Sequence, residues 1–89
     1  IINTDRPPKS FGRFSRFRVA TVDANRIALE HKLGSPTAPI VNTAILGAFS
    51  KITAMVSIDA VIEAVKEFVP TNKVGNAAAT KEAYERAIA

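Results

Sequence analysis

The chain contains no cysteine, no tryptophan and only one histidine, His31. Without cysteine it forms no disulfide and offers no thiolate to a zinc ion or an iron–sulfur cluster. A histidine-based metal site would need ligands from another segment, because a single imidazole is too few. The residues themselves therefore indicate no metal site and no thiol chemistry.

Long hydrophobic runs are also absent. The longest stretch without charge, Leu33–Ser50, is broken by Gly34, Pro36 and Pro39, whereas a membrane-spanning helix needs about 20 predominantly apolar residues. No signal-peptide pattern is present, so we expect a cytoplasmic protein that does not enter a membrane. The composition, 47% hydrophobic and 22% charged over 89 residues, is that of one small folded domain.

The chain starts with Ile1-Ile2-Asn3-Thr4-Asp5 and has no initiator methionine. Such a β-branched start is typical of the end of a buried strand. We therefore expect a piece of a longer polypeptide, or a processed or incompletely traced one.

The net charge of +4 is concentrated near the start of the chain. Residues 1–18 contain one acidic residue, Asp5, and five basic ones, whereas residues 19–89 are balanced; the basic residues are Arg6, Lys9, Arg13, Arg16 and Arg18. Phe11, Phe14 and Phe17 alternate with them. Three interpretations remain open: phenylalanines packed into a neighbouring subunit, an anionic ligand or acidic partner, or nucleic acid bound by stacking and phosphate contacts.

The pattern of residues predicts an α/β fold with two short strands and about four helices. The strands are expected at Ile1–Thr4 and Phe17–Val22, joined by a polar connection over Lys9–Ser15. The helices are expected at Ala24–Leu33, from about Asn42 to Ile52, from Ile58 to about Val69, and over roughly Val74–Ala87. Because two strands do not form a stable sheet alone, we expect the sheet to be completed elsewhere.

The helix boundaries have recognisable signals. Asp23 and Ser57 are predicted N-caps, and Asn42 or Thr43 is the predicted cap of the second helix. Gly34 is the predicted left-handed stop of the first helix, followed by a turn-forming linker over Ser35–Pro39. The third helix carries an apolar stripe and ends before a proline; the stripe is Ile58, Val61, Ile62, Val65, Phe68 and Val69.

The segment 39–49 is apolar, and we expect its helix to be buried on most sides, which needs more protein around it than 89 residues comfortably supply. Gly47 within it costs about 1 kcal/mol relative to alanine, which predicts the close approach of another backbone. Asn42 and Thr43, at the start of this helix, are also candidates to bind an anion or a ligand oxygen beside free amides. Simple capping is the alternative for both.

Other polar residues have structural and functional interpretations. Asp23 and Asn25 follow a strand, where α/β sheets bind ligands, although capping also explains them. His31 has no acid spaced along the sequence to assist it. The helical glutamates are expected on solvated faces; they are Glu30, Glu63, Glu67, Glu82 and Glu85.

Several segments follow one another in an order that resembles a known family. They are Ile1–Asp5, Val22–Ala28, Val41–Phe49, Val56–Asp59 and Asn76–Glu85. In order and spacing this set is similar to the C-terminal half of the gamma subunit of 2-oxoacid:ferredoxin oxidoreductases, pyruvate synthase among them. The resemblance covers nearly the whole chain. It implies that residues 1–89 are the C-terminal portion of a single gamma-type domain, part of a Rossmann-like three-layer fold.

The resemblance also implies a multi-subunit enzyme with alpha, beta and delta types of subunit. Such enzymes decarboxylate a 2-oxoacid on thiamine diphosphate, pass electrons through [4Fe–4S] clusters to ferredoxin and release an acyl-CoA. It implies no catalytic residue in this chain, and we expect the isolated chain to be inactive. Asn42, Thr43, Arg13, Arg16 and Arg18 are the candidates for contacts with an anionic ligand such as coenzyme A, or with other subunits.

The alternative is a small basic module that binds nucleic acid or another anion and has no enzymatic activity. Its binding would weaken steeply with salt and disappear when Arg13, Arg16 and Arg18 become alanine. No recognition-helix pattern accompanies the basic segment, which disfavours nucleic acid. The sequence leaves the particular 2-oxoacid, the direction of the reaction and the oligomeric state open.

Overall fold

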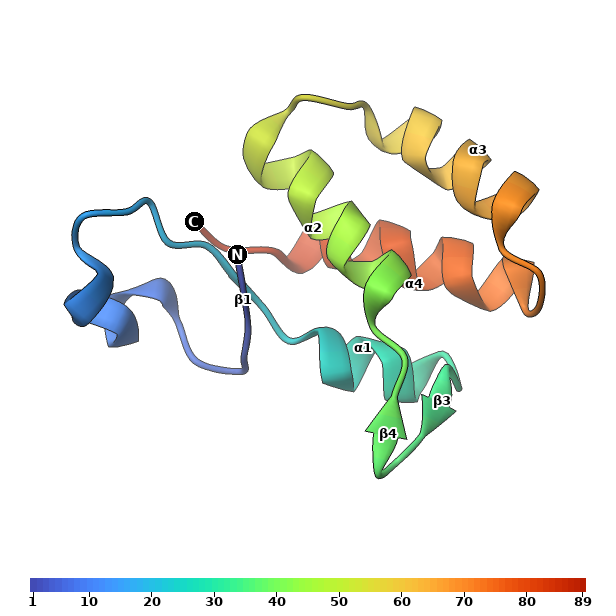
Figure 1. Cartoon of the computed structure of the whole chain (residues 1–89), viewed down its shortest axis with the longest axis horizontal. Helices are drawn as coiled ribbons and strands as arrows, with labels where there is room; N and C mark the ends of the chain where they lie inside the picture. The colour runs from blue at the N-terminus through green and yellow to red at the C-terminus, as the bar shows by residue number, and fades with distance from the viewer.

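A pair of parallel strands and four α-helices form the framework of the chain, and the computed structural model describes all 89 residues. The elements, in chain order, are β1 (Ile2–Asn3), the 3₁₀ helix η1 (Pro8–Phe14), β2 (Thr21–Val22), α1 (Ala24–Glu30), β3 (Gly34–Ser35), β4 (Ala38–Pro39), α2 (Asn42–Thr53), α3 (Ile58–Phe68) and α4 (Lys73–Arg86). The molecule is flat, 38 × 31 × 16 Å, and the loop that contains η1 projects from the helices (Figure 1). The predicted α/β class is confirmed.

The two parallel strands are short. Ile2 lies opposite Thr21 and Asn3 opposite Val22. On its other side, Thr21 exchanges two backbone hydrogen bonds with Ile88, of 2.7 and 2.9 Å. β2 therefore has neighbours on both sides, whereas β1 pairs only with β2 and keeps one edge unpaired.

Two predicted N-caps are confirmed. Asp23 Oδ1 accepts a hydrogen bond of 3.1 Å from the Arg26 amide at the start of α1, and Ser57 Oγ accepts one of 3.2 Å from the Ala60 amide at the start of α3. Each side chain satisfies one of the amides that a helix leaves free in its first turn. The prediction that Asn42 or Thr43 caps the second helix is wrong, because both lie inside α2 and Val41 is its N-cap residue.

Some predicted boundaries differ from the structure. Helix α1 ends at Glu30, three residues early, and Lys32 rather than Gly34 has the left-handed conformation just after it (φ 57°). Gly34 (φ 81°) instead begins the hairpin β3–β4, which replaces the predicted linker; a Cβ on it would collide with the Ala38 carbonyl oxygen. The strand predicted over Phe17–Val22 is reduced to Thr21–Val22, because its partner β1 is only two residues long.

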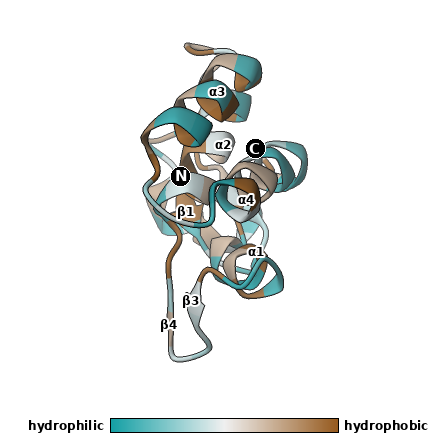
Figure 2. Cartoon of the chain, turned by 90° about the vertical axis from the view of Figure 1, so that its right-hand side faces the viewer, coloured by the Kyte–Doolittle hydropathy of each residue, from teal (hydrophilic) through white to brown (hydrophobic).

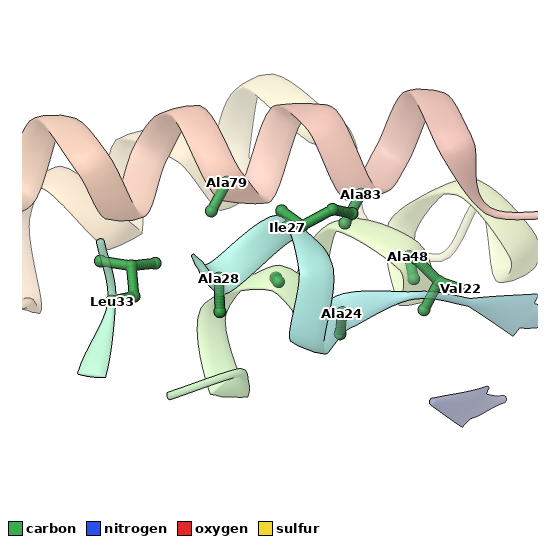
Figure 3. Packing of buried hydrophobic residues seen from close by; sticks show 9 residues of the cluster. Val22, Ala24, Ile27, Ala28, Leu33, Ala48, Ala79 and Ala83 are labelled. Atoms are coloured by element: carbon green, nitrogen blue, oxygen red, sulfur yellow. The ribbon is translucent and has the colours of Figure 1, made fainter. Parts of the chain in front are cut away.

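The core is made mainly of alanine. Nine buried hydrophobic residues from β2, α1, α2, α4 and the segment before β3 form one cluster: Val22, Ala24, Ile27, Ala28, Leu33, Ala44, Ala48, Ala79 and Ala83 (Figure 3). Because alanine side chains are short, α2 and α4 pack with their backbones close together. A Cβ on Gly47 would overlap the Thr80 carbonyl group, so the predicted close approach at Gly47 is confirmed.

Within these 89 residues α2 is buried on one face only, and its expected burial by further protein stays a prediction. One face of α2 is buried, with Ala44, Gly47 and Ala48 on it, but Leu46 and Phe49 on the other side are 47% and 37% exposed. The apolar stripe of α3 is similarly open, since Val65 is its only buried member. Figure 2 shows hydrophobic and hydrophilic residues alternating around α3. None of the helices is both long and apolar enough to span a membrane.

Candidate functional site

A cavity of about 540 Å³ lies at the carboxyl ends of β1 and β2. Its lining comes from the segment after β1, the end of β2, the first turn of α1 and the end of the chain: Thr4, Asp5, Arg6, Pro7, Thr21, Val22, Asp23, Arg26, Ile27, Arg86 and Ile88. In α/β folds the carboxyl ends of parallel strands are the usual place for a ligand. We call this cavity the strand-end pocket.

The N-terminus of α1 forms one wall of the strand-end pocket, and side chains already satisfy its amides. Asn3 Oδ1 accepts a hydrogen bond of 2.9 Å from the Ala24 amide, while Asn3 Nδ2 donates to Asn25 Oδ1 at 2.9 Å. The capping interpretation is thus supported for Asp23, whereas Asn25 lies inside α1 and only accepts a hydrogen bond from Asn3, which provides the second cap. Free helix amides are therefore not available to a ligand in this pocket, and only side chains could contact one.

Three arginines and two aspartates, Asp5 and Asp23, are the charged residues of the strand-end pocket. Arg26 and Arg86 form ion pairs with Glu30 and Glu82, at 3.2 and 3.3 Å, through their Nε atoms. The guanidinium of Arg6 lies 4.7 Å from the centre of the Phe11 ring, a cation–π contact. The guanidinium group is planar, keeps its charge and pairs in a forked geometry with carboxylates and phosphates. The arginines are thus the groups of this pocket that could pair with an anion, whereas the carboxyl groups of Asp5 and Asp23 would oppose it.

Behind this pocket, Glu82 links α4 to the end of α1. Its Oε1 lies 2.8 Å from His31 Nε2, in a side-chain hydrogen bond between residues 51 positions apart. Its Oε2 is 3.3 Å from Arg86 Nε, a distance that makes an ion pair without a well-directed hydrogen bond. The hydrogen bond from His31 lowers the pKa of Glu82 below its usual 4.5, although burial acts in the opposite direction.

This contact corrects two expectations. Glu82 is not on a solvated face, since its side chain is only 21% exposed. His31 does have an acid beside it, which sequence spacing did not reveal. The two residues meet because α1 packs against α4. This packing is a property of the tertiary fold, so the sequence alone held no signal for the pair.

Asn42 and Thr43 have different environments. Asn42 is exposed, and its Oδ1 accepts a hydrogen bond of 2.8 Å from the Thr43 amide. Thr43 is buried, and its hydroxyl donates to Asn76 Oδ1 at 2.7 Å. The Thr80 hydroxyl donates in turn to the carbonyl oxygens of Thr43 and Asn76, at 3.1 and 2.8 Å. The Thr43 hydroxyl therefore joins α2 to α4, and of the two residues only Asn42 is accessible to a ligand.

The arginines predicted to contact an anion lie on the projecting loop that contains η1. All three are exposed, and Arg13 lies 5.0 Å from the centre of the Phe14 ring. None of them lines the strand-end pocket. Arg18 lines a second cavity instead, beside Ile1 and α2. The structure therefore separates Arg13, Arg16 and Arg18 from the arginines of the pocket, Arg6, Arg26 and Arg86, which the sequence did not single out as a site.

Metal-binding side chains do not gather anywhere in the chain. No group of three or more histidine, aspartate or glutamate residues is placed to hold an ion, and cysteine is absent from the sequence.

A family model described as pyruvate ferredoxin/flavodoxin oxidoreductase matches residues 1–88. The chain is similar to pyruvate synthase subunit PorC of Methanothermobacter marburgensis, with 49% identity over 71 residues, which are 78% of this chain and 37% of that protein. It is also similar to the pyruvate/ketoisovalerate oxidoreductases common subunit gamma of Pyrococcus furiosus, with 48% identity over 71 residues, 78% of this chain and 36% of that protein.

The fold has a similar counterpart among solved structures. Pyruvate oxidoreductase subunit PORC from Thermotoga maritima superimposes with a TM-score of 0.75 and 26% identity, over 96% of this chain and 48% of that one. The present chain thus spans less than half the length of these relatives.

Proposed function

The chain belongs to the pyruvate ferredoxin/flavodoxin oxidoreductase family, and on this premise we propose that it works as part of a gamma subunit in a 2-oxoacid:ferredoxin oxidoreductase. Residues 1–89 are then the C-terminal portion of one gamma-type, Rossmann-like domain. The complex decarboxylates pyruvate or a related 2-oxoacid to an acyl-CoA and transfers electrons to ferredoxin. The observation that carries the proposal is the match of the family model along residues 1–88.

The role of this chain in such a complex is structural and ligand-binding. The complex uses thiamine diphosphate, [4Fe–4S] clusters and coenzyme A. Because the chain has no cysteine, cluster ligands come from other segments. Coenzyme A fits the chemistry available here: its phosphates can pair with Arg6, Arg26 and Arg86 around the strand-end pocket. Arg13, Arg16 and Arg18 on the exposed loop are the proposed contacts to alpha, beta or delta subunits, and Asn42 is the accessible candidate on α2.

The test is a chimeric PorC. In it, these 89 residues replace the matching segment of PorC from Methanothermobacter marburgensis, and the chimera is co-expressed with the other subunits of that enzyme. We expect the chimera to co-purify with them and to restore ferredoxin reduction that depends on both pyruvate and coenzyme A.

The matched control is the chimera with Ala28→Asp, which places a charge in the alanine core and should neither assemble nor restore activity. A chimera that folds but never co-purifies with the other subunits would show that the proposed function is wrong.

A further inference from the structure

The pair His31–Glu82 lies directly behind an arginine of the strand-end pocket. Glu82 Oε1 is 2.8 Å from His31 Nε2, and Glu82 Oε2 is 3.3 Å from Arg86 Nε. Arg86 lines the pocket, whereas His31 and Glu82 do not. One carboxylate is therefore shared between an imidazole and a guanidinium group that borders the pocket.

The charge of this carboxylate is incompletely compensated when His31 is neutral. The side chain of Glu82 is 21% exposed, and its Oε2 atom is buried without a hydrogen-bond donor. The hydrogen bond from His31 lowers the pKa of Glu82, so the carboxylate stays ionised throughout the pH range in which a histidine titrates. Over that whole range Glu82 therefore competes with an anionic ligand for Arg86.

Positive and negative charges around the strand-end pocket nearly cancel. Three arginines and two aspartates line it, and two glutamates pair with two of the arginines; these residues are Arg6, Arg26, Arg86, Asp5, Asp23, Glu30 and Glu82. With His31 neutral, the four carboxylates outnumber the three guanidinium groups by one. A proton on His31 restores the balance. One added charge about 10 Å from a bound anion changes its affinity severalfold.

The surroundings contain no second histidine that would respond in the same pH range. His31 is the only one, with Glu30 and Lys32 beside it in the chain. The β3–β4 hairpin, which packs against α1, has no titratable residue, and α2 contributes only Lys51, whose Nζ lies 5.2 Å from the centre of the Tyr84 ring. The remaining charged residues of α3 and α4 form no ion pair; they are Asp59, Glu63, Lys66, Glu67, Lys73, Lys81 and Glu85.

We propose that protonation of His31 strengthens the binding of a phosphate group in the strand-end pocket. The protonated imidazole neutralises Glu82, so that Arg86 pairs with the ligand. Where His31 is neutral, Glu82 holds Arg86 and the ligand binds more weakly. The inference rests on the proposed function in one respect, namely that the pocket takes an anionic group, and it adds that this binding depends on pH.

The test compares the affinity of the 89-residue chain for sulfate at pH 5.5 and pH 8. Sulfate is a suitable probe because it keeps both negative charges over this range. Binding is followed by the NMR signals of the pocket arginines at one low ionic strength, since salt screens the effect. We expect the parent to bind sulfate about threefold or more tightly at pH 5.5. The α-amino group of Ile1 borders the other cavity, and every variant retains it.

Two substitutions separate this linkage from a structural role. His31→Gln keeps a hydrogen-bond donor for Glu82 and loses the titrating group, so its affinity should equal the pH 8 value of the parent at both pH values. Glu82→Gln removes the competing charge, so its affinity at pH 8 should already reach the pH 5.5 value of the parent. Glu85→Gln, at an exposed position of α4 outside the pocket, is the matched control and should follow the parent.

A reciprocal measurement needs no substitution and therefore stands even if a variant does not fold. If a proton on His31 strengthens sulfate binding, sulfate must favour the protonated imidazole by the same factor. The chain has a single histidine, so its imidazole C–H signals are identified without assignment. Saturating sulfate should raise the midpoint of this titration by about half a pH unit, which corresponds to the threefold change in affinity.

The proposal and the proposed function fail separately, because the sulfate experiment needs no other subunit. Sulfate binding that is absent, or equal at the two pH values, would overturn the proposal, and so would a His31→Gln variant whose affinity still rises at pH 5.5. The assembly of the chimeric PorC is unaffected by these results. Proton-linked sulfate binding in a chain whose chimera folds but never assembles would support the linkage and refute the proposed function.

Discussion

Gly47 of α2 lies directly against the backbone of Thr80 in α4. A Cβ built on Gly47 would overlap the Thr80 carbonyl oxygen and would lie 2.8 Å from the carbonyl carbon. Only glycine allows the two helices to approach this closely, and the alanines around it, Ala44, Ala48, Ala79 and Ala83, keep them close along their length. The contact thus sets the spacing of two helices that together supply four of the nine residues of the core cluster.

Gly47→Ala should destabilise the chain despite the better helix propensity of alanine. The atom that a new methyl group meets is backbone, which cannot rotate away, so overpacking should exceed the gain of about 1 kcal/mol from propensity. We expect a net loss of about 1–3 kcal/mol in the free energy of unfolding, measured with urea. Gly12→Ala is the matched control, because nothing lies within 4 Å of its Cβ position. A Gly47→Ala variant as stable as the parent would contradict the conclusion that the Gly47–Thr80 contact sets the spacing of α2 and α4.

Thr43→Val should show that the Thr43 hydroxyl is a structural link. The substitution keeps the shape of the side chain and leaves the buried Asn76 Oδ1 without its donor. An unsatisfied buried acceptor costs about 1–3 kcal/mol, which urea unfolding will detect. Thr71→Val, at an exposed threonine, should change the stability by less than about 0.5 kcal/mol. If the two variants have the same free energy of unfolding, the Thr43 hydroxyl is not a structural link and stays a candidate to bind a ligand, as the sequence suggested.

Local signals made part of this fold predictable. Asp23 and Ser57 are followed by apolar helical patterns, and each caps its helix as expected. Gly47 stands out because glycine is costly inside a helix, and the cost indicates a close neighbour. These features depend on residues within about one helical turn, or on a single unusual residue, so no tertiary information was needed to find them.

The candidate site was less predictable because its contacts join distant residues. Asn3 and Ala24 are 21 positions apart, Thr43 and Asn76 are 33 apart, and His31 and Glu82 are 51 apart. The three arginines of the strand-end pocket come from the ends of different elements. The end of α1 was predicted too late in the chain. Gly34 belongs to the hairpin β3–β4, and Lys32 takes the left-handed conformation after the helix instead.

The Glu82 contacts predict a pH dependence of stability. The pKa of Glu82 is lower in the folded chain than its ordinary value of 4.5, first because of the hydrogen bond with His31. A lowered folded-state pKa contributes stability that is complete above pH 4.5 and is lost as the pH falls through the folded-state value. Glu82→Gln should therefore lose up to about 1 kcal/mol at pH 6 relative to the parent, and this difference should shrink toward pH 3.

The control for this pH dependence is Glu85→Gln on the same helix, where the glutamate is exposed. Its unfolding free energy should follow that of the parent at every pH. A constant difference between Glu82→Gln and the parent from pH 6 to pH 3 would mean that the charge of Glu82 contributes nothing to folding.

The exposed arginines of the η1 loop predict a salt-dependent contact with acidic surfaces of partner subunits. Replacing Arg13, Arg16 and Arg18 by alanine in the chimeric PorC should weaken its association with the other subunits by about tenfold or more at low salt, because steering by these charges is lost. The difference should decrease as the Debye length falls from about 10 Å at 0.1 M salt to about 3 Å at 1 M. The fold should be retained, since all three side chains are exposed.

The matched control replaces Lys66 and Lys81, exposed cations on α3 and α4. The nucleic-acid alternative would be favoured by two results together: the arginine variant associates with the other subunits as strongly as the parent, and the parent binds RNA or DNA in a salt-sensitive way that requires the three arginines.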